Sequence, residues 1–112
     1  MAVARAISLR TIAFGDISGT FAAVGSPIDQ NLRVFKVTNN TDGDMIVSLD
    51  GTTDNLFVPR NSFTLYDLST NAPPISQVDN FPLEFNTQFY VRQNTAPTLG
   101  DVWIEGFYAR GQ

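Results

Sequence analysis

Short apolar runs separated by clusters of turn-forming residues occupy the middle of the chain, from Val37 to Asn71. The runs MIVSL, LFV and FTLYDL are too short for typical helices, and Asn, Thr, Asp, Gly and Pro lie between them. Runs of this length, bounded by turn residues, are typical of β-strands. The stretch therefore predicts three strands joined by tight turns, and it shows no catalytic motif.

The same pattern extends over the rest of the chain and predicts about eight short strands without a persuasive helix. Helix is the competing prediction for residues 2–14, but the β-branched residues there and the missing helix caps favour a strand. With 112 residues the chain is long enough for one independent core. We therefore predict an all-β fold, a single antiparallel β-sandwich that is jelly-roll-like. The predicted strands are 6–14, 20–24, 31–38, 44–49, 56–58, 62–68, 87–92 and 101–110.

One domain is expected to cover residues 1–112, with residues 1–5 and 111–112 as extended arms. Residues 69–82 form one long loop, which contains three of the six prolines. Pro73 and Pro74 favour an extended path, because proline has no amide hydrogen to give to a sheet. We expect this loop to be able to reach a neighbouring molecule.

Two Asp-Gly pairs mark predicted corners of the fold, Asp42-Gly43 and Asp50-Gly51. Glycine adopts positive φ at low cost, as tight hairpin turns require. We expect the first pair to join the strands on either side of it as a hairpin, and the second pair to close strand 44–49.

The composition of strand 31–38 and of the later strands predicts which residues are buried. Strand 31–38 has apolar residues on both faces, which favours a central position. Large side chains dominate burial in small sandwiches, so most aromatic residues of the later strands are expected in the core. These residues are Phe63, Tyr66, Phe89, Tyr90, Trp103, Phe107 and Tyr108.

The composition also excludes several classes of function. The chain has 7 basic and 11 acidic residues and a net charge of -4, and its basic residues are scattered. We expect no nucleic-acid partner, since phosphate backbones are bound by clustered Lys and Arg. The absence of Cys and His excludes a Ser-His-Asp triad, a Cys-His pair and the usual zinc ligands. No apolar run approaches the ~20 residues that cross a bilayer, so we expect no membrane partner, and we expect no cofactor.

Four acidic residues lie close together in the sequence: Asp42, Asp44, Asp50 and Asp54. A pair of carboxylates could serve a glycosidase, and clustered oxygens could bind calcium. The EF-hand pattern fails in both registers that the glycines allow, which leaves an irregular oxygen site between turns. All four residues lie at predicted turns, where Asp is favoured for its hydrogen bonds to the backbone. We expect turn formation to be their role.

From Thr38 to Asn71 the chain resembles a family of small tailed-bacteriophage virion proteins. The matching features are NNTDGDMIVSLDGTTDNLFVP, the strand leading to YDLSTN, the TQFYVRQ strand with the Thr/Pro/Gly turn after it, and the closing VWIEGFYAR. The N-terminal strand and the AAVGSPID turn match more weakly. The resemblance implies a non-enzymatic structural protein, present in many copies on the phage head or at the head-tail neck, as a capsid decoration or a connector or collar component.

The resemblance implies other virion proteins and copies of this chain as partners, in a virion made in the cytoplasm of a host bacterium. We expect the contacts to come from the chain ends and the long loop, because the strands are needed for the core. The candidate contact residues are Ala2, Val3, Arg5, Pro73, Pro74, Ile75, Val78 and Phe81.

Two other functions stay open at the level of sequence. One is a carbohydrate- or receptor-binding sandwich at the phage tail, which would use turn Asp and Asn residues with an exposed Trp103 or Tyr90. The other is a hydrolase, which would need carboxylates such as Asp42 or Asp50 across a cleft.

Overall fold

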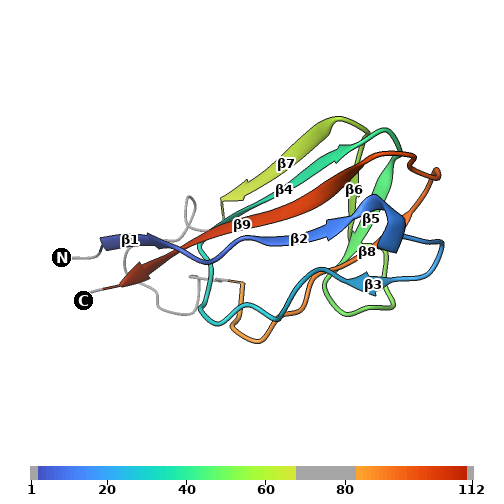
Figure 1. Cartoon of the computed structure of the whole chain (residues 1–112). Coiled ribbons are helices and arrows are strands. Elements are labelled where there is room, and N and C mark those ends of the chain that lie inside the picture. The colour runs from blue at the N-terminus through green and yellow to red at the C-terminus, as the bar shows by residue number, and fades with distance from the viewer. Residues whose placement is uncertain (1–2, 68–82, 111–112) are drawn as a thin grey trace.

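The computed structural model of the chain describes residues 3–67 and 83–110. These residues form nine strands in two antiparallel sheets, which lie against each other as two layers (Figure 1). One sheet contains β1 (Val3–Ala6), β2 (Arg10–Ala13), β9 (Gly100–Arg110), β4 (Val34–Thr41) and β7 (Ser62–Asp67). The other contains β3 (Ala22–Ala23), β8 (Tyr90–Gln93), β5 (Met45–Ser48) and β6 (Leu56–Val58). A short 3-10 helix, η1 (Phe14–Asp16), follows β2.

The strands pair as a set of nested hairpins. β5 pairs with β6, β4 with β7, β3 with β8 and β2 with β9, so each pair encloses the one before it along the chain. Pairing of β4 with β9 and of β5 with β8 then joins these pairs into two sheets. This strand order is that of a jelly roll. The predicted all-β sandwich is therefore confirmed. No helix in the described ranges has the length and hydropathy needed to span a bilayer.

The core lies between the two sheets and is built mainly from aliphatic side chains. Successive residues of a strand point to opposite faces, so Val102 and Ile104 of β9 and Val47 of β5 are fully buried. Phe35 of β4 and Phe89 join the two layers, with 5.5 Å between their ring centroids. Burial of each such side chain contributes about 1.5–3 kcal/mol to stability. Other buried apolar residues are Val24, Ile28, Leu32, Val37, Met45, Val58 and Val91.

Several of the late aromatic residues lie outside the core, contrary to expectation. Of those named above, Phe89 is fully buried, whereas Phe63 is 57% exposed and Phe107 is 48% exposed. The pleat of the strands gives the reason, because burial of Ile104 turns Phe107, three residues later, to the outer face. In β7, Tyr66 packs against the core, which turns Phe63 outward in the same way.

The N-terminal residues differ from the prediction in two ways. Residues 3–5, expected in an arm, belong to β1, which pairs with residues 107–110 of β9. The predicted strand 6–14 is interrupted at residues 7–9, after which β2 pairs with residues 101–104 of β9. Every backbone N–H and C=O group of a long strand needs a partner. Two short strands therefore share one edge of β9.

The first Asp-Gly pair does not form a hairpin turn. β4 continues to Thr41 and β5 lies in the other sheet, so the residues between them carry the chain from one layer to the other. Gly43 does not have a positive φ. Glycine is needed there for space, because a Cβ atom would overlap the carbonyl oxygen of Thr95. The expected pairing of strand 31–38 with strand 44–49 is therefore wrong.

Two buried polar side chains hold this crossover in place. Asn39 Nδ2 donates to the carbonyl oxygens of Gly43 at 2.8 Å and Val58 at 3.0 Å. Asn39 Oδ1 accepts from the backbone N–H of Thr41 at 3.0 Å and from its hydroxyl at 2.6 Å. Both side chains are fully buried, and their hydrogen bonds offset the cost of removing them from water. The network fixes the end of β4, the crossover and the end of β6 relative to one another.

The second Asp-Gly pair lies in the connection between β5 and β6, which pair as a hairpin. Gly51 has a φ of 86°, a conformation that costs glycine little and other residues more. The two Asp-Gly pairs thus use glycine for different reasons, space at Gly43 and backbone conformation at Gly51.

Replacing Asn39 with Ala is expected to lower the free energy of unfolding by about 3 kcal/mol, because the carbonyl groups of Gly43 and Val58 each lose one donor and the N–H of Thr41 loses its acceptor. Urea unfolding followed by circular dichroism measures this change. Asn40→Ala is the matched control, since Asn40 is exposed and should shift the value by less than about 0.5 kcal/mol. Equal destabilisation by the two substitutions would contradict the role given to the buried network.

Candidate functional site

Asp50 binds donors within its own turn. Its carboxylate accepts hydrogen bonds from the backbone N–H groups of Thr52 at 2.9 Å and Thr53 at 2.8 Å. The hydroxyls of Ser48 and Thr53 each donate to it at 2.8 Å. These donors stabilise the charged form, the backbone N–H of Thr52 most of all, and hold the pKa of Asp50 well below its usual range.

The other three acidic side chains of this stretch also bind separate partners. In each case the hydrogen bonds stabilise the charged carboxylate and lower its pKa. Within residues 3–67 and 83–110, no three acidic side chains gather where a metal ion could bind. The principal donors are the hydroxyl and N–H of Thr98 for Asp42, the N–H of Arg60 for Asp44 (3.0 Å), and the guanidinium of Arg92 for Asp54 (2.7 Å).

Trp103 and Tyr90, considered above for carbohydrate binding, lie on different sheets. Trp103 is on β9 between the buried residues Val102 and Ile104, so it faces outward from the five-stranded sheet. Its indole Nε1 donates to the carboxylate of Asp101 at 2.6 Å. Tyr90 is on β8 of the four-stranded sheet. The two rings therefore do not form one platform.

Most of the contact residues expected from sequence lie outside the described residues. Val3 lies in β1, and the side chain of Arg5 in the same strand is exposed. The extended arm 111–112 and the long loop 69–82 are outside the described ranges, so their role in contacts stays a prediction. The same holds for Ala2, Pro73, Pro74, Ile75, Val78 and Phe81.

Four large apolar side chains lie together on the outer face of the five-stranded sheet, around one shallow hollow. They are Leu9 (56% exposed), Phe63 (57%), Leu65 (57%) and Phe107 (48%). We call them, with the residues between them, the apolar sheet face. A cluster of exposed apolar side chains on one face is a candidate interaction site.

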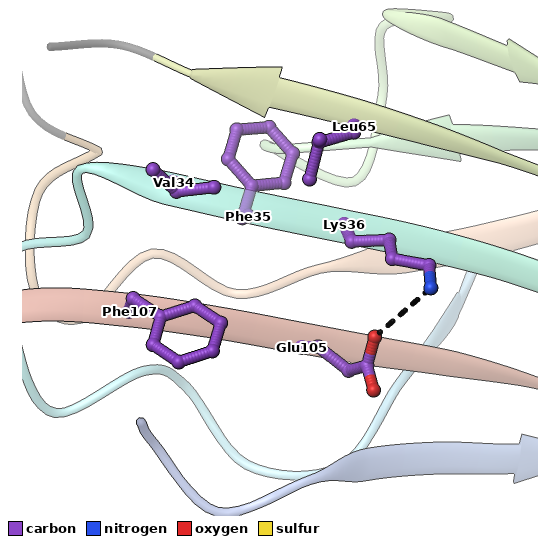
Figure 2. A pocket seen from close by; sticks show the side chains of 6 residues that line it. All are labelled: Val34, Phe35, Lys36, Leu65, Glu105 and Phe107. Carbon is purple, nitrogen blue, oxygen red and sulfur yellow. Dashed lines mark ion pairs between the residues drawn. The ribbon is translucent and has the colours of Figure 1, made fainter. Parts of the chain in front are cut away.

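The register of three neighbouring strands brings Leu65 and Phe107 to the same face as Lys36 and Glu105. Leu65 of β7 lies opposite Lys36 of β4, which lies opposite Glu105 of β9. At the next outward position, Val34 of β4 lies opposite Phe107 of β9. Figure 2 shows these five side chains on three adjacent strands, around a smaller hollow in the same face. Opposite residues on one face of a sheet are in direct contact range.

An ion pair lies between the apolar side chains. Lys36 Nζ is 3.6 Å from Glu105 Oε1, and the two side chains are 36% and 42% exposed. Lys36 Nζ is also 4.7 Å from the centroid of the Phe63 ring. Water screens an ion pair at this exposure, so it contributes only about 0–1 kcal/mol to stability. The apolar sheet face thus presents one positive and one negative charge side by side, each still open to solvent.

The outer face of the four-stranded sheet has a different character. Phe57 of β6 is 53% exposed and lies opposite Ile46 of β5. Beside them, Arg92 forms an ion pair with Asp54 at 2.7 Å, and its guanidinium is 5.6 Å from the ring of Phe21. Phe57 is therefore an exposed aromatic residue away from the apolar sheet face, which makes it a suitable control position.

Reasoning from the sequence missed the apolar sheet face. In the strand predicted over residues 62–68, Phe63 and Leu65 alternate with Thr64 and Tyr66. Both faces of such a strand carry a large side chain, so alternation does not identify the buried one. The sequence did contain one signal. It has more large apolar residues in its strands than one core of this size can bury, which indicates that some of them lie on the surface.

A scan against protein-family models and searches of curated proteins and of solved structures found no match to this chain.

The lowered pKa of Asp50 is expected to make stability depend on pH in acid. In the unfolded chain Asp titrates near about 3.9. The stabilisation from charged Asp50 is therefore fully present above that pH and is lost as the pH falls toward the lower pKa of the folded state. Asp50→Asn should destabilise the protein at about pH 6, with a difference from wild type that shrinks at about pH 3.

Urea unfolding at both pH values measures this difference. Asp29→Asn is the control, since Asp29 lies in an exposed loop. A difference between wild type and Asp50→Asn that stays constant with pH would show that the hydrogen bonds to the carboxylate do not depend on its charge.

Proposed function

We propose that this chain is a non-enzymatic structural protein of a bacteriophage particle, present in many copies on the head or at the head-tail neck. The observation that carries the proposal is the apolar sheet face, which offers a surface for protein–protein contact. The resemblance of residues 38–71 to small virion proteins of tailed phages supplies the setting. Its partners in this proposal are other virion proteins and copies of itself.

The physical character of the surface supports a contact role. Leu9, Phe63, Leu65 and Phe107 expose about half of their side-chain area each, and covering apolar area is favourable by about 25 cal/mol per Å². Three of them lie on or beside paired strands with fixed register, so little backbone freedom is lost on contact. Only 16% of the residues are charged, which lowers the cost of removing water from the surface.

The fold itself is compatible with more than one role, because jelly rolls occur in viral capsid domains and in lectins. A lectin-like site would need aromatic and polar side chains converging on one sugar. Trp103 and Tyr90 lie on different sheets, and the turn acids Asp42 and Asp50 accept hydrogen bonds from their own loops and neighbours. These placements favour the contact role over a carbohydrate site.

Substitution within the apolar sheet face should reduce incorporation into phage particles. In a phage that encodes Leu65→Glu, we expect severalfold fewer copies per particle, because an apolar contact would be replaced by a charged side chain that must lose water on burial. Phe57→Glu, on the other sheet, is the matched control and should leave incorporation unchanged. Quantitative mass spectrometry of purified particles counts the copies, and circular dichroism of both variants checks that they fold.

Deletion of the gene tests the proposal as a whole. Electron microscopy and protein composition of the purified particles should reveal a missing component, altered particle stability or incomplete particles. Unchanged composition and morphology would overturn the proposal.

A further inference from the structure

We infer that the apolar sheet face binds the same face of a second copy of this chain, about a two-fold axis that runs along the strands between β4 and β9. The inference rests on the proposed function for its setting, in which many copies of the chain lie near one another. It names the occupant of the face, which is the chain itself.

The arrangement of charge on the face fits a copy of itself. Lys36 and Glu105 lie at the same level on adjacent strands. A two-fold axis between these strands places each β4 over the β9 of the other copy. Lys36 of each copy then faces Glu105 of the other, so the two-fold axis creates two equivalent contacts between opposite charges. Two opposite charges on one face thus become four charges in alternating order, with no like charges directly opposed.

The same axis superimposes apolar positions as well. Val34 shares a level with Phe107 on the neighbouring strand, so each Val34 meets the Phe107 of the other copy. Leu65, beyond β4, and Leu9, beyond β9, line the same hollow as the ion pair, and the axis brings each one over the other. The symmetry therefore matches Lys36 with Glu105, Val34 with Phe107, and Leu65 with Leu9.

The area of the face predicts a weak pairing. A Phe or Leu side chain that is half exposed leaves about 100 Å² uncovered, so the four side chains expose about 400 Å² per copy. Two copies would bury about 800 Å² of apolar surface before the polar surroundings are counted. Interfaces below about 1,200 Å² are typical of weak complexes. Such pairing is expected to be concentration-dependent in solution and to strengthen where copies are held close together.

Removal of water from the centre of the face would strengthen the charge contacts. Lys36 and Glu105 are each more than one-third exposed in the isolated chain, and water screens them there. Between two copies the apolar side chains around them exclude water. The charges then determine which partner can bind. A partner that places a like charge opposite Lys36 or Glu105 would bind more weakly, because repulsion between like charges is strong where water is excluded.

Sedimentation velocity of the purified full chain tests the pairing. From about 5 μM to about 500 μM, a range that spans the affinities of weak interfaces, wild type should change from monomer to dimer. Leu65→Glu should remain a monomer throughout, whereas the control Phe57→Glu should follow wild type. A wild-type chain that stays monomeric over the whole range overturns the inference, as does equal behaviour of the two Glu variants.

Reversal of the central charges identifies the partner as a second copy. Lys36→Glu leaves only acidic groups at the centre and Glu105→Lys leaves only basic groups, so each variant alone should pair at least about tenfold more weakly than wild type. An equimolar mixture should form a heterodimer, because the acidic centre of one variant then faces the basic centre of the other. With one variant labelled with ¹⁵N, native mass spectrometry distinguishes this heterodimer from either homodimer by mass.

The mixture also serves as the folding control, since only correctly folded chains can restore the pair. Wild-type-like dimers of the single variants would place the dimer contact elsewhere on the molecule and overturn the inference. A mixture that stays monomeric would also overturn the inference. The apolar sheet face would then be expected to bind a different virion protein. Neither result bears on the gene-deletion experiment, so failure of the pairing and failure of the phage assignment are separate outcomes.

Discussion

The crossover between β4 and β5 is the constraint on which the rest of the sandwich depends. Asn39 and Thr41 are fully buried there, and their side chains bond the backbone of Gly43 and the end of β6. Polar groups removed from water are tolerated only with complete hydrogen bonding. The network therefore permits one path for the chain, which leaves one sheet at Thr41 and enters the other at Met45. β5 is then free to pair with β6 and β8, and β4 with β7 and β9.

That arrangement decides which surface the protein presents. With β4 between β9 and β7, the alternate residues Phe35 and Val37 turn into the core, and Lys36 turns outward. The neighbouring strands follow the same alternation, so large apolar side chains that would otherwise enlarge the core collect on the outer face of the sheet. Apolar area left in water is a cost to the isolated chain. In the proposed role, contact between protein surfaces removes that cost.

The acidic residues show how a pattern typical of chemistry can serve structure instead. Clustered carboxylates in sequence could indicate a metal site or a catalytic pair. In the fold they are distributed among separate partners, with Asp50 bound to its own turn and Asp42 bound to Thr98, which is distant in sequence but lies in the neighbouring loop. Their lowered pKa values arise from these hydrogen bonds, and the bonds hold turns and loops in place.

The sequence by itself determined the fold class, most strand positions and the role of glycine at Gly51, because these depend on local alternation and turn chemistry. It did not determine that the Asp42-Gly43 segment crosses between sheets, because a crossover and a hairpin use the same turn residues. The face on which Phe63, Leu65 and Phe107 lie was decided only by the tertiary structure. A strand with large side chains on both faces has two possible orientations, and the pairing of distant strands selects one of them.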